Sequence, residues 1–151
     1  MQDVKRAIRW LKQRSPAAGR VNGAQIILFG GSSGGQLAAL AAATPGQFEP
    51  DGTASASEEV AVDSTVDGIV SLAGPSDFRT LFPDPHPWVA GAVESWLGCE
   101  PCSDARLAEA SPIAYVGNDV PPAYWAYGEA DPLVPPAGAE NSWFDLVDGA
   151  S

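Results

Sequence analysis

The fold is decided by residues 27–38, which read ILFGGSSGGQLA. The residues that lead into this stretch, from Gln25 to Phe29, form a nearly continuous apolar run of the kind found in a parallel strand covered on both faces. Residues 36–43 are rich in alanine and leucine, which favours a helix, and Pro45 and Gly46 end that pattern. The stretch therefore predicts a buried strand, a sharp glycine-rich turn and a helix.

The rest of the chain repeats this alternation of strands and helices. Two further apolar runs, residues 69–73 and 123–127, each lead into a turn that contains Gly, Pro and Asp. Acidic and polar residues 47–65 predict a surface loop. Strands that alternate with helices form βαβ units, whose right-handed crossovers place helices on both faces of a parallel sheet. We therefore predict the α/β class, with further helices at residues 2–14, 88–97, 104–110 and 137–147.

Three strands are few for a parallel sheet, because such a sheet has open edges with unpaired backbone groups. The pattern is typical of a segment of a wider sheet. We predict one partial domain over residues 1–151, with a lid-like insert at about residues 79–110. Open edges of this kind also favour self-association.

Ser32 lies inside the glycine-rich turn, in the pattern GxSxG that residues 30–34 spell. A serine hydroxyl is a weak nucleophile at neutral pH, so it must stand exposed on a sharp turn where a base can reach it. The elbow glycines Gly30, Gly31 and Gly34 let the chain turn that tightly. The turn also aims the backbone N–H of Ser33 at the place where a tetrahedral intermediate develops negative charge. The pattern predicts Ser32 as a nucleophile and Ser33 as half of an oxyanion hole.

One alternative is a glycine-rich connection that merely packs closely or binds an anion. A dinucleotide site is disfavoured, because the GxGxxG spacing is absent and no acidic residue ends a second strand at the required distance. The position of the serine, between an apolar strand and an alanine-rich helix, favours the catalytic interpretation.

Residues 27–38 resemble the nucleophile elbow of the α/β-hydrolase esterases, most closely the acetyl and feruloyl esterase-like and hormone-sensitive-lipase-like groups. The resemblance continues through residues 70–78, 110–113 and 121–135, so it covers nearly the whole chain. It implies a partial α/β-hydrolase fold and a serine carboxylic ester hydrolase that acts through an acyl-enzyme, without metal or cofactor. The resemblance implies that its substrates are small acyl or aromatic esters, including acetyl groups on plant polysaccharide.

In that family a Gly-x-x-Asp-x-x-Val-Pro motif after a strand holds the acid of the catalytic triad. Residues 128–135 match this motif, so the resemblance carries the role over to Asp131. A carboxylate at the C-terminal end of a strand can orient the imidazole of a base and stabilise its charged form. The alternative is that Asp131 only organises the turn before Pro132.

The family's order is Ser, Asp, His, and no histidine follows Asp131 here. The single histidine, His86, lies between two prolines before the acid, and we interpret it as an exposed loop residue rather than the base. The His-Gly-Gly loop that donates the second oxyanion N–H in these esterases is also absent. We therefore expect part of a longer gene product, inactive or very weak by itself.

Two other functions stay open. A serine peptidase of the prolyl-oligopeptidase type would share both the elbow and the acid. The second alternative is a non-catalytic remnant of a hydrolase.

Residues near these motifs are candidates for the substrate pocket. Asp77 ends the second predicted strand, where it would either line the pocket or cap a turn. Trp88 and Trp96 lie in the lid-like segment and are candidates for substrate contact. The other tryptophans are predicted to be buried, Trp10 and Trp125 in the core and Trp143 on the inner side of the final helix.

Composition narrows the class of partner but leaves the compartment open, because Met1 need not be the natural start of the protein. Eight basic and 19 acidic residues give a formal net charge of -11, which opposes binding to nucleic acid or anionic lipid. No apolar run approaches the roughly 20 residues of a membrane span, and the N-terminus shows no signal peptide. Cys99 and Cys102 supply too few ligands for a zinc site, so we expect loop cysteines or one local disulfide. The expected partner is a small-molecule ester or acylated carbohydrate.

Overall fold

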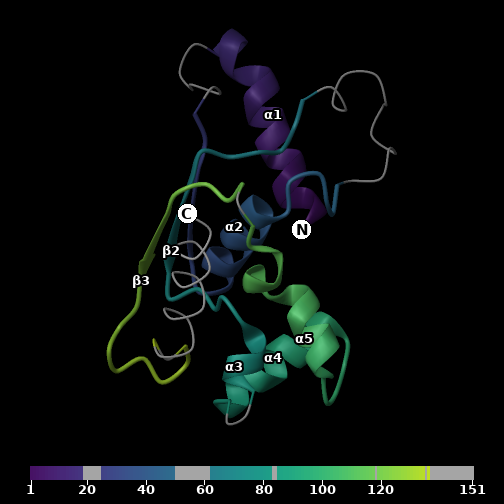
Figure 1. Cartoon of the computed structure of the whole chain (residues 1–151), viewed down its shortest axis with the longest axis vertical. Helices are drawn as coiled ribbons and strands as arrows, with labels where there is room; N and C mark the ends of the chain where they lie inside the picture. Colours follow the sequence, from purple (N-terminus) through teal and green to yellow (C-terminus); the bar gives the residue numbers. More distant parts are fainter. Residues whose placement is uncertain (19–24, 50–61, 83–84, 118, 135, 137–151) are drawn as a thin grey trace.

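A three-stranded parallel sheet forms the centre of the molecule, in the order β1 (Ile27–Gly31), β2 (Gly68–Leu72) and β3 (Ala123–Ala126). The structure is a computed structural model that describes residues 1–18, 25–49, 62–82, 85–117, 119–134 and 136 (Figure 1). The register places Phe29 beside Val70 and Val70 beside Tyr124. This sheet and its helices confirm the prediction of a partial α/β-hydrolase fold.

The helices fall into two groups around the sheet (Figure 1). Helix α2 (Ser33–Ala43) packs along the sheet beside α1 (Gln2–Ala18), whereas α3 (Phe78–Leu81), α4 (Pro87–Leu97) and α5 (Asp104–Ala110) cluster at one end of the molecule. A 3-10 helix, η2 (Pro112–Tyr115), joins α5 to the layer of α2. The predicted helix at 137–147, with Trp143, lies outside the described residues, as does much of the predicted loop at 47–65.

The core forms where α2 lies against the sheet. Alanines 38, 39, 42 and 43 of α2 pack against Ile69 of β2 and Trp125 of β3, with Ile113 of η2 beside them. Alanine is short enough to let the helix axis approach the strands closely, and each buried methyl still contributes to the hydrophobic free energy. The prediction that Trp125 packs in the core is confirmed, since it is 9% exposed.

Two predictions about burial are wrong. Strand β1 is not covered on both faces by the described residues, because Ile27 is 65% and Phe29 is 71% exposed. Successive strand side chains point to opposite faces, so Leu28 packs inward while its two neighbours point to the uncovered face. Trp10 is 51% exposed rather than buried, because the stripe of α1 that packs on Ile26 and Ala41 consists of Val4, Ile8 and Leu11.

A buried lysine anchors α1 to the end of α2. The side chain of Lys5 is fully buried, and its Nζ donates a hydrogen bond to the carbonyl of Thr44, the C-cap residue of α2. The carboxylate of Glu49 lies 3.7 Å from this Nζ and also pairs with Arg9. Burial, and to a lesser degree the nearby charge of Arg9, lowers the pKa of Lys5 to about 8.

This lysine makes a testable contribution to the pH dependence of stability. The lowered pKa means that, between about pH 8 and 10.5, the unfolded chain binds more protons than the folded chain. The free energy of unfolding should therefore rise with pH across this window, by up to about 3 kcal/mol. Urea denaturation at pH 7.5 and 9.5 would measure the rise, and Lys5→Met should flatten it. Equal slopes in the two proteins would show that Lys5 does not titrate in this way.

Candidate active site

The predicted nucleophile, Ser32, lies between β1 and α2 in a backbone conformation that is rare for a residue with a side chain. Its φ of 52° lies in the positive range that favours glycine, and its ψ is -125°. Its N–H donates to the carbonyl of Leu72 at 2.8 Å, and its carbonyl accepts from the N–H of Gln36 at 3.1 Å. These two hydrogen bonds hold the turn in place. The unfavourable backbone conformation of Ser32 costs on the order of 1–3 kcal/mol.

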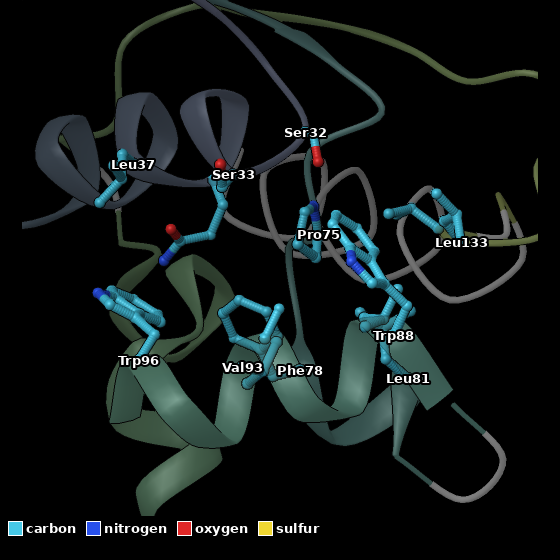
Figure 2. A pocket seen from close by; sticks show the side chains of 14 residues that line it. Ser32, Ser33, Leu37, Pro75, Phe78, Leu81, Trp88, Val93, Trp96 and Leu133 are labelled. Atoms are coloured by element: carbon cyan, nitrogen blue, oxygen red, sulfur yellow. The ribbon is translucent and has the colours of Figure 1, made fainter. Parts of the chain in front are cut away.

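The side chain of Ser32 is exposed and makes no capping hydrogen bond to α2. Figure 2 shows its hydroxyl pointing toward the cavity that the labelled side chains line. Ser33 is the first residue of α2, and the N–H groups of a first helical turn have no partner within the helix. The turn thus brings together an exposed hydroxyl and the positive end of a helix dipole, as the GxSxG pattern predicts.

Close packing around this turn requires glycine at some positions and not at others. A Cβ on Gly30 would lie 2.2 Å from the backbone of Gly34, and one on Gly35 would lie 2.4 Å from the Oγ of Ser71. By contrast, a Cβ on Gly34 would meet no atom of the described chain within 4 Å, and one on Gly31 would make an ordinary contact at 3.8 Å. The steric prediction therefore holds at Gly30 and fails at Gly34. Gly35 and Gly74, which the sequence motif does not single out, are also required, because a Cβ on Gly74 would lie 2.3 Å from the same Oγ of Ser71.

Ser32 opens onto a cavity of about 370 Å³ between α2 and α4. Residues Trp88, Val89, Ala92, Val93 and Trp96 form one long wall, since all of them lie on one face of α4. The opposite side comes from the start of α2 and from the turn after β2, and the loop after β3 closes one end. The remaining lining residues are Ser32, Ser33, Gln36, Leu37, Pro75, Phe78, Leu81, Leu133 and Val134.

Buried contacts hold the two sides of the cavity in place. The amide of Gln36 in α2 donates to the carbonyl of Ala110 at 2.6 Å, which ties α2 to the last residue of α5. Phe78 is buried against α4, and its ring centroid lies 6.2 Å from that of Trp96. Sequence reasoning assigned no role to Gln36 or Phe78, although both lie in stretches that carry the family resemblance, because their partners come from distant parts of the chain. Their apolar neighbours on α4 could have been found from the spacing of residues 89, 93 and 96.

The predicted acid, Asp131, lies in the turn after β3. Its Oδ1 accepts hydrogen bonds from the N–H groups of Leu133 at 2.8 Å and Val134 at 3.1 Å. Within the described part of the chain, no donor hydrogen-bonds the other oxygen, Oδ2. Leu133 and Val134 both line the cavity, so the turn that Asp131 organises is part of its wall. The geometry therefore accommodates both interpretations of Asp131, with one oxygen organising the turn and the other available to a base.

His86 lies away from this constellation. It is the exposed N-cap residue of α4, and its Nδ1 accepts a hydrogen bond from the N–H of Trp88 at 3.3 Å. It is not among the residues that line the cavity. The structure thus brings Ser32 and the Asp131 turn to one cavity and leaves the single histidine of the sequence outside it.

Asp77 acts as a helix cap and does not line the cavity. Its side chain accepts from the N–H of Arg79 at 2.9 Å at the start of α3, pairs with the Arg79 guanidinium, and accepts from Ser111 Oγ at 3.4 Å. Burial by itself raises the pKa of Asp77, but the hydrogen bonds and the charge of Arg79 outweigh this and hold it below its usual range. Of the two predicted pocket residues, Trp88 therefore lines the cavity, whereas Asp77 caps α3, the helix whose Phe78 and Leu81 line it.

Loss of this cap should destabilise the helical layer under the cavity. Asp77→Ala is expected to lower the free energy of unfolding by about 1–2 kcal/mol at pH 7. Because the pKa of Asp77 is lowered on folding, its contribution is present above about pH 4 and is lost as the pH falls below that. Asp77→Asn keeps an acceptor oxygen for the cap and should lose less. Denaturant unfolding at pH 7 and pH 3 distinguishes the variants, and an alanine variant as stable as the original chain would contradict the capping role.

Other expectations concern metal, disulfide and membrane features. Cys99 and Cys102 form a disulfide in the connection between α4 and α5, which is one of the two arrangements expected for them. Among the residues that the structure describes, no three His, Cys, Asp or Glu side chains gather as a metal site would require. No helix in the described ranges has the length and apolar character needed to cross a bilayer.

A parallel sheet that carries a strained serine between a strand and a helix, with an acidic turn two strands away, defines the α/β-hydrolase class. Comparison with known proteins places the chain within that class. Residues 1–143 match the BD-FAE family, and the chain belongs to this family.

Individual relatives are ester hydrolases. The chain is 34% identical over 137 residues to the probable carboxylic ester hydrolase LipM of Mycobacterium tuberculosis, in a match that covers 88% of this chain and 30% of LipM. Among solved structures, a truncated carbohydrate esterase from gut microbiota is 28% identical, with a TM-score of 0.77 over 99% of this chain and 55% of that one. The butyrate-bound esterase Est2 of Thermogutta terrifontis is 25% identical, with a TM-score of 0.68 over 99% and 50%. The chain thus spans less than a third of LipM and about half of each structure.

Proposed function

We propose that Ser32 is the nucleophile of a carboxylic ester hydrolase that acts through an acyl-enzyme. The observation that carries the proposal is the backbone of Ser32, which is held at a φ of 52° while its hydroxyl stays exposed at an apolar cavity. A residue other than glycine persists in such a conformation when the surrounding structure requires it. Catalysis supplies a reason, because the turn presents the hydroxyl to substrate and to a base at once.

The reaction divides the work among three groups. The Oγ of Ser32 bonds to the ester carbonyl carbon while its proton passes to a base, and the N–H of Ser33 donates to the oxyanion that forms. The C–O bond then breaks and the alcohol leaves with that proton. Water, giving a proton to the same base, releases the acid and restores the hydroxyl. Asp131, through its Oδ2, orients the base and stabilises its charged form.

The substrate is proposed to be an uncharged ester. LipM is a probable carboxylic ester hydrolase, one solved relative is a carbohydrate esterase, and another has butyrate bound, which together support acyl esters, including those on carbohydrates. The net charge of -11 and the absence of charged side chains from the described lining also favour an uncharged substrate.

Trapping of the acyl-enzyme tests this proposal. The sequence has one histidine and it lies outside the cavity, so imidazole in solution supplies the base. The chain is mixed with p-nitrophenyl butyrate and imidazole, the reaction is quenched in acid, and the mass of the intact chain is measured by mass spectrometry. The expected result is one butyryl group per chain, mapped by proteolysis to Ser32.

A matched control is Ser95→Ala, which removes another exposed serine, on α4 but not among the residues that line the cavity. This variant should be acylated on Ser32 to the same extent as the original chain. Acylation that maps elsewhere, or a chain that remains unmodified across a range of imidazole concentrations, would reject Ser32 as the nucleophile.

A further inference from the structure

The described lining of the cavity next to Ser32 is apolar except at the turn and the start of α2. Three of its 14 lining residues, Ser32, Ser33 and Gln36, have polar side chains other than indole, and all three come from the turn and the start of α2. The amide of Gln36 is already bonded to the Ala110 carbonyl. Away from Ser32 the described lining therefore offers an incoming group hydrophobic contact and little hydrogen bonding. A sugar ring or a phenolic hydroxyl placed there would lose its bonds to water without replacement.

Two tryptophans stand at the two ends of the α4 wall. Figure 2 shows Trp88 beside Pro75 and Leu133, and Trp96 at the other end, with Val93 and Phe78 between them. The two indoles are 68% and 54% exposed, so α4 presents large apolar surfaces to solvent within a concave site. Exposed aromatic rings that line a cavity are candidates for ligand contact, because a ligand can bury area that the fold leaves open.

The length of this wall sets the size of the ligand. Trp88 and Trp96 are eight residues apart on one helix, which separates them by roughly 12 Å along its axis. An extended aliphatic chain that lies along the wall and ends near Ser32 would cover part of this length with about six to eight carbons. An acetyl group is too short to contact Val89 and Val93 together, or both indoles.

We infer that the α4 wall binds an uncharged aliphatic chain of about six to eight carbons, held between Trp88 and Trp96. This inference rests on the proposed function, since it names the substrate class of the same site: esters that carry a medium-length aliphatic chain rather than acetyl esters. Trp88 and Trp96 are then the residues that determine specificity. The negative net charge disfavours the free fatty acid and favours its neutral ester.

Binding can be measured without any turnover. Primary amides are neutral and keep the alkyl chain of the corresponding acid, so hexanamide and acetamide are compared by NMR titration of the indole N–H signals of the Ser32→Ala chain. Four additional methylenes should make hexanamide bind at least about tenfold more tightly. The signals of Trp88 and Trp96 should shift, and that of Trp10, on α1, should not.

Variants assign the effect to α4. Trp96→Ala should weaken hexanamide binding by about tenfold, whereas Trp10→Ala, which removes a similarly exposed indole from α1, should leave the affinity unchanged. Ala92→Phe keeps both tryptophans and fills the cavity from an exposed position, so it should abolish binding even if Trp96→Ala fails to fold. Equal affinity for the two amides, or hexanamide binding that survives Ala92→Phe, would overturn the inference.

A second experiment determines whether the aliphatic chain lies on the acyl side or on the alcohol side of the ester. Acylation of Ser32 by vinyl hexanoate faster than by vinyl acetate would place it on the acyl side, and acylation by hexyl acetate faster than by methyl acetate would place it on the alcohol side. Hexanamide binding that depends on Trp96, in a chain that no ester acylates, would reject the proposed function and leave this inference intact. Acylation of Ser32 at the same rate by esters of every chain length would support the proposed function and reject this inference.

Discussion

Ser32→Gly is expected to stabilise the folded chain by about 1 kcal/mol and to abolish acylation at this position. The gain arises because glycine adopts a φ of 52° without the steric cost that serine bears, which exceeds the extra entropy of glycine in the unfolded chain. The loss of acylation arises because the nucleophilic oxygen is gone, and it should be at least a hundredfold, on the order of what removal of a catalytic nucleophile causes.

Ser32→Ala separates the two effects. Alanine keeps the Cβ and therefore the strain, so its free energy of unfolding should stay within about 0.5 kcal/mol of the original, while its acylation should be lost as completely as in the glycine variant. Urea denaturation and mass spectrometry on the three proteins give both quantities. A glycine variant less stable than the alanine variant would mean that the turn is not strained.

The effect of Ser32→Ala is best measured by the extent of acylation rather than by the steady-state rate of ester hydrolysis. Residues of a triad act as a unit, so when the base is missing the loss of the serine has little further effect on the rate. The difference in acylation between the original chain and Ser32→Ala should therefore grow with the concentration of added imidazole. A difference that is independent of imidazole would indicate that another group on the chain serves as the base.

Gly30→Ala is expected to be the most destabilising single substitution in the elbow, at about 3 kcal/mol or more. The added methyl would lie 2.2 Å from the carbonyl group of Gly34, and a backbone atom cannot move aside as the end of a flexible side chain can. Relief would require the end of β1 and the start of α2 to separate, while the core alanines later in the same helix hold α2 against the sheet. Thermal and urea unfolding, followed by circular dichroism, would measure the loss.

Gly34→Ala provides the matched control, because it makes the same chemical change four residues away. Its methyl would enter space that the described atoms leave open, in the first turn of α2, so it should be neutral or stabilising by up to about 1 kcal/mol. If the two alanine variants unfolded at the same urea concentration, the close approach of Gly30 to α2 would not be a determinant of the fold.

The sequence was informative where a local pattern has one structural solution. The apolar run predicted β1, the GxSxG pattern predicted the sharp turn that exposes Ser32, and the alanine-rich segment predicted α2. The turn at Asp131 was predicted from its resemblance to a family motif. Helix α5 was predicted with its observed bounds, and α4 to within one residue. Both helices have clear N-terminal signals, a proline at the first position of α4 and a capping serine before α5.

The remaining features depend on partners distant in the chain. Whether Trp10 is buried is decided by the face of α1 that meets α2, and a helical pattern with several apolar residues does not fix this rotation. The need for glycine at position 35 comes from Ser71, which is 36 positions away. The cavity likewise combines residues from four separate stretches of the chain, so its shape could not be predicted from any one of them.

The hydrogen bonds at the ends of the strands carry a last consequence. The N–H of Ser32 donates to the carbonyl of Leu72, and the N–H of Ala73 donates to the carbonyl of Ala126, so the turn that carries Ser32 is linked through β2 to the strand that leads to Asp131. Two strand spacings, about 10 Å, separate these outer backbones. Under the proposed function, this fixed spacing of the strands would limit how far apart the serine and the acid of a triad can lie.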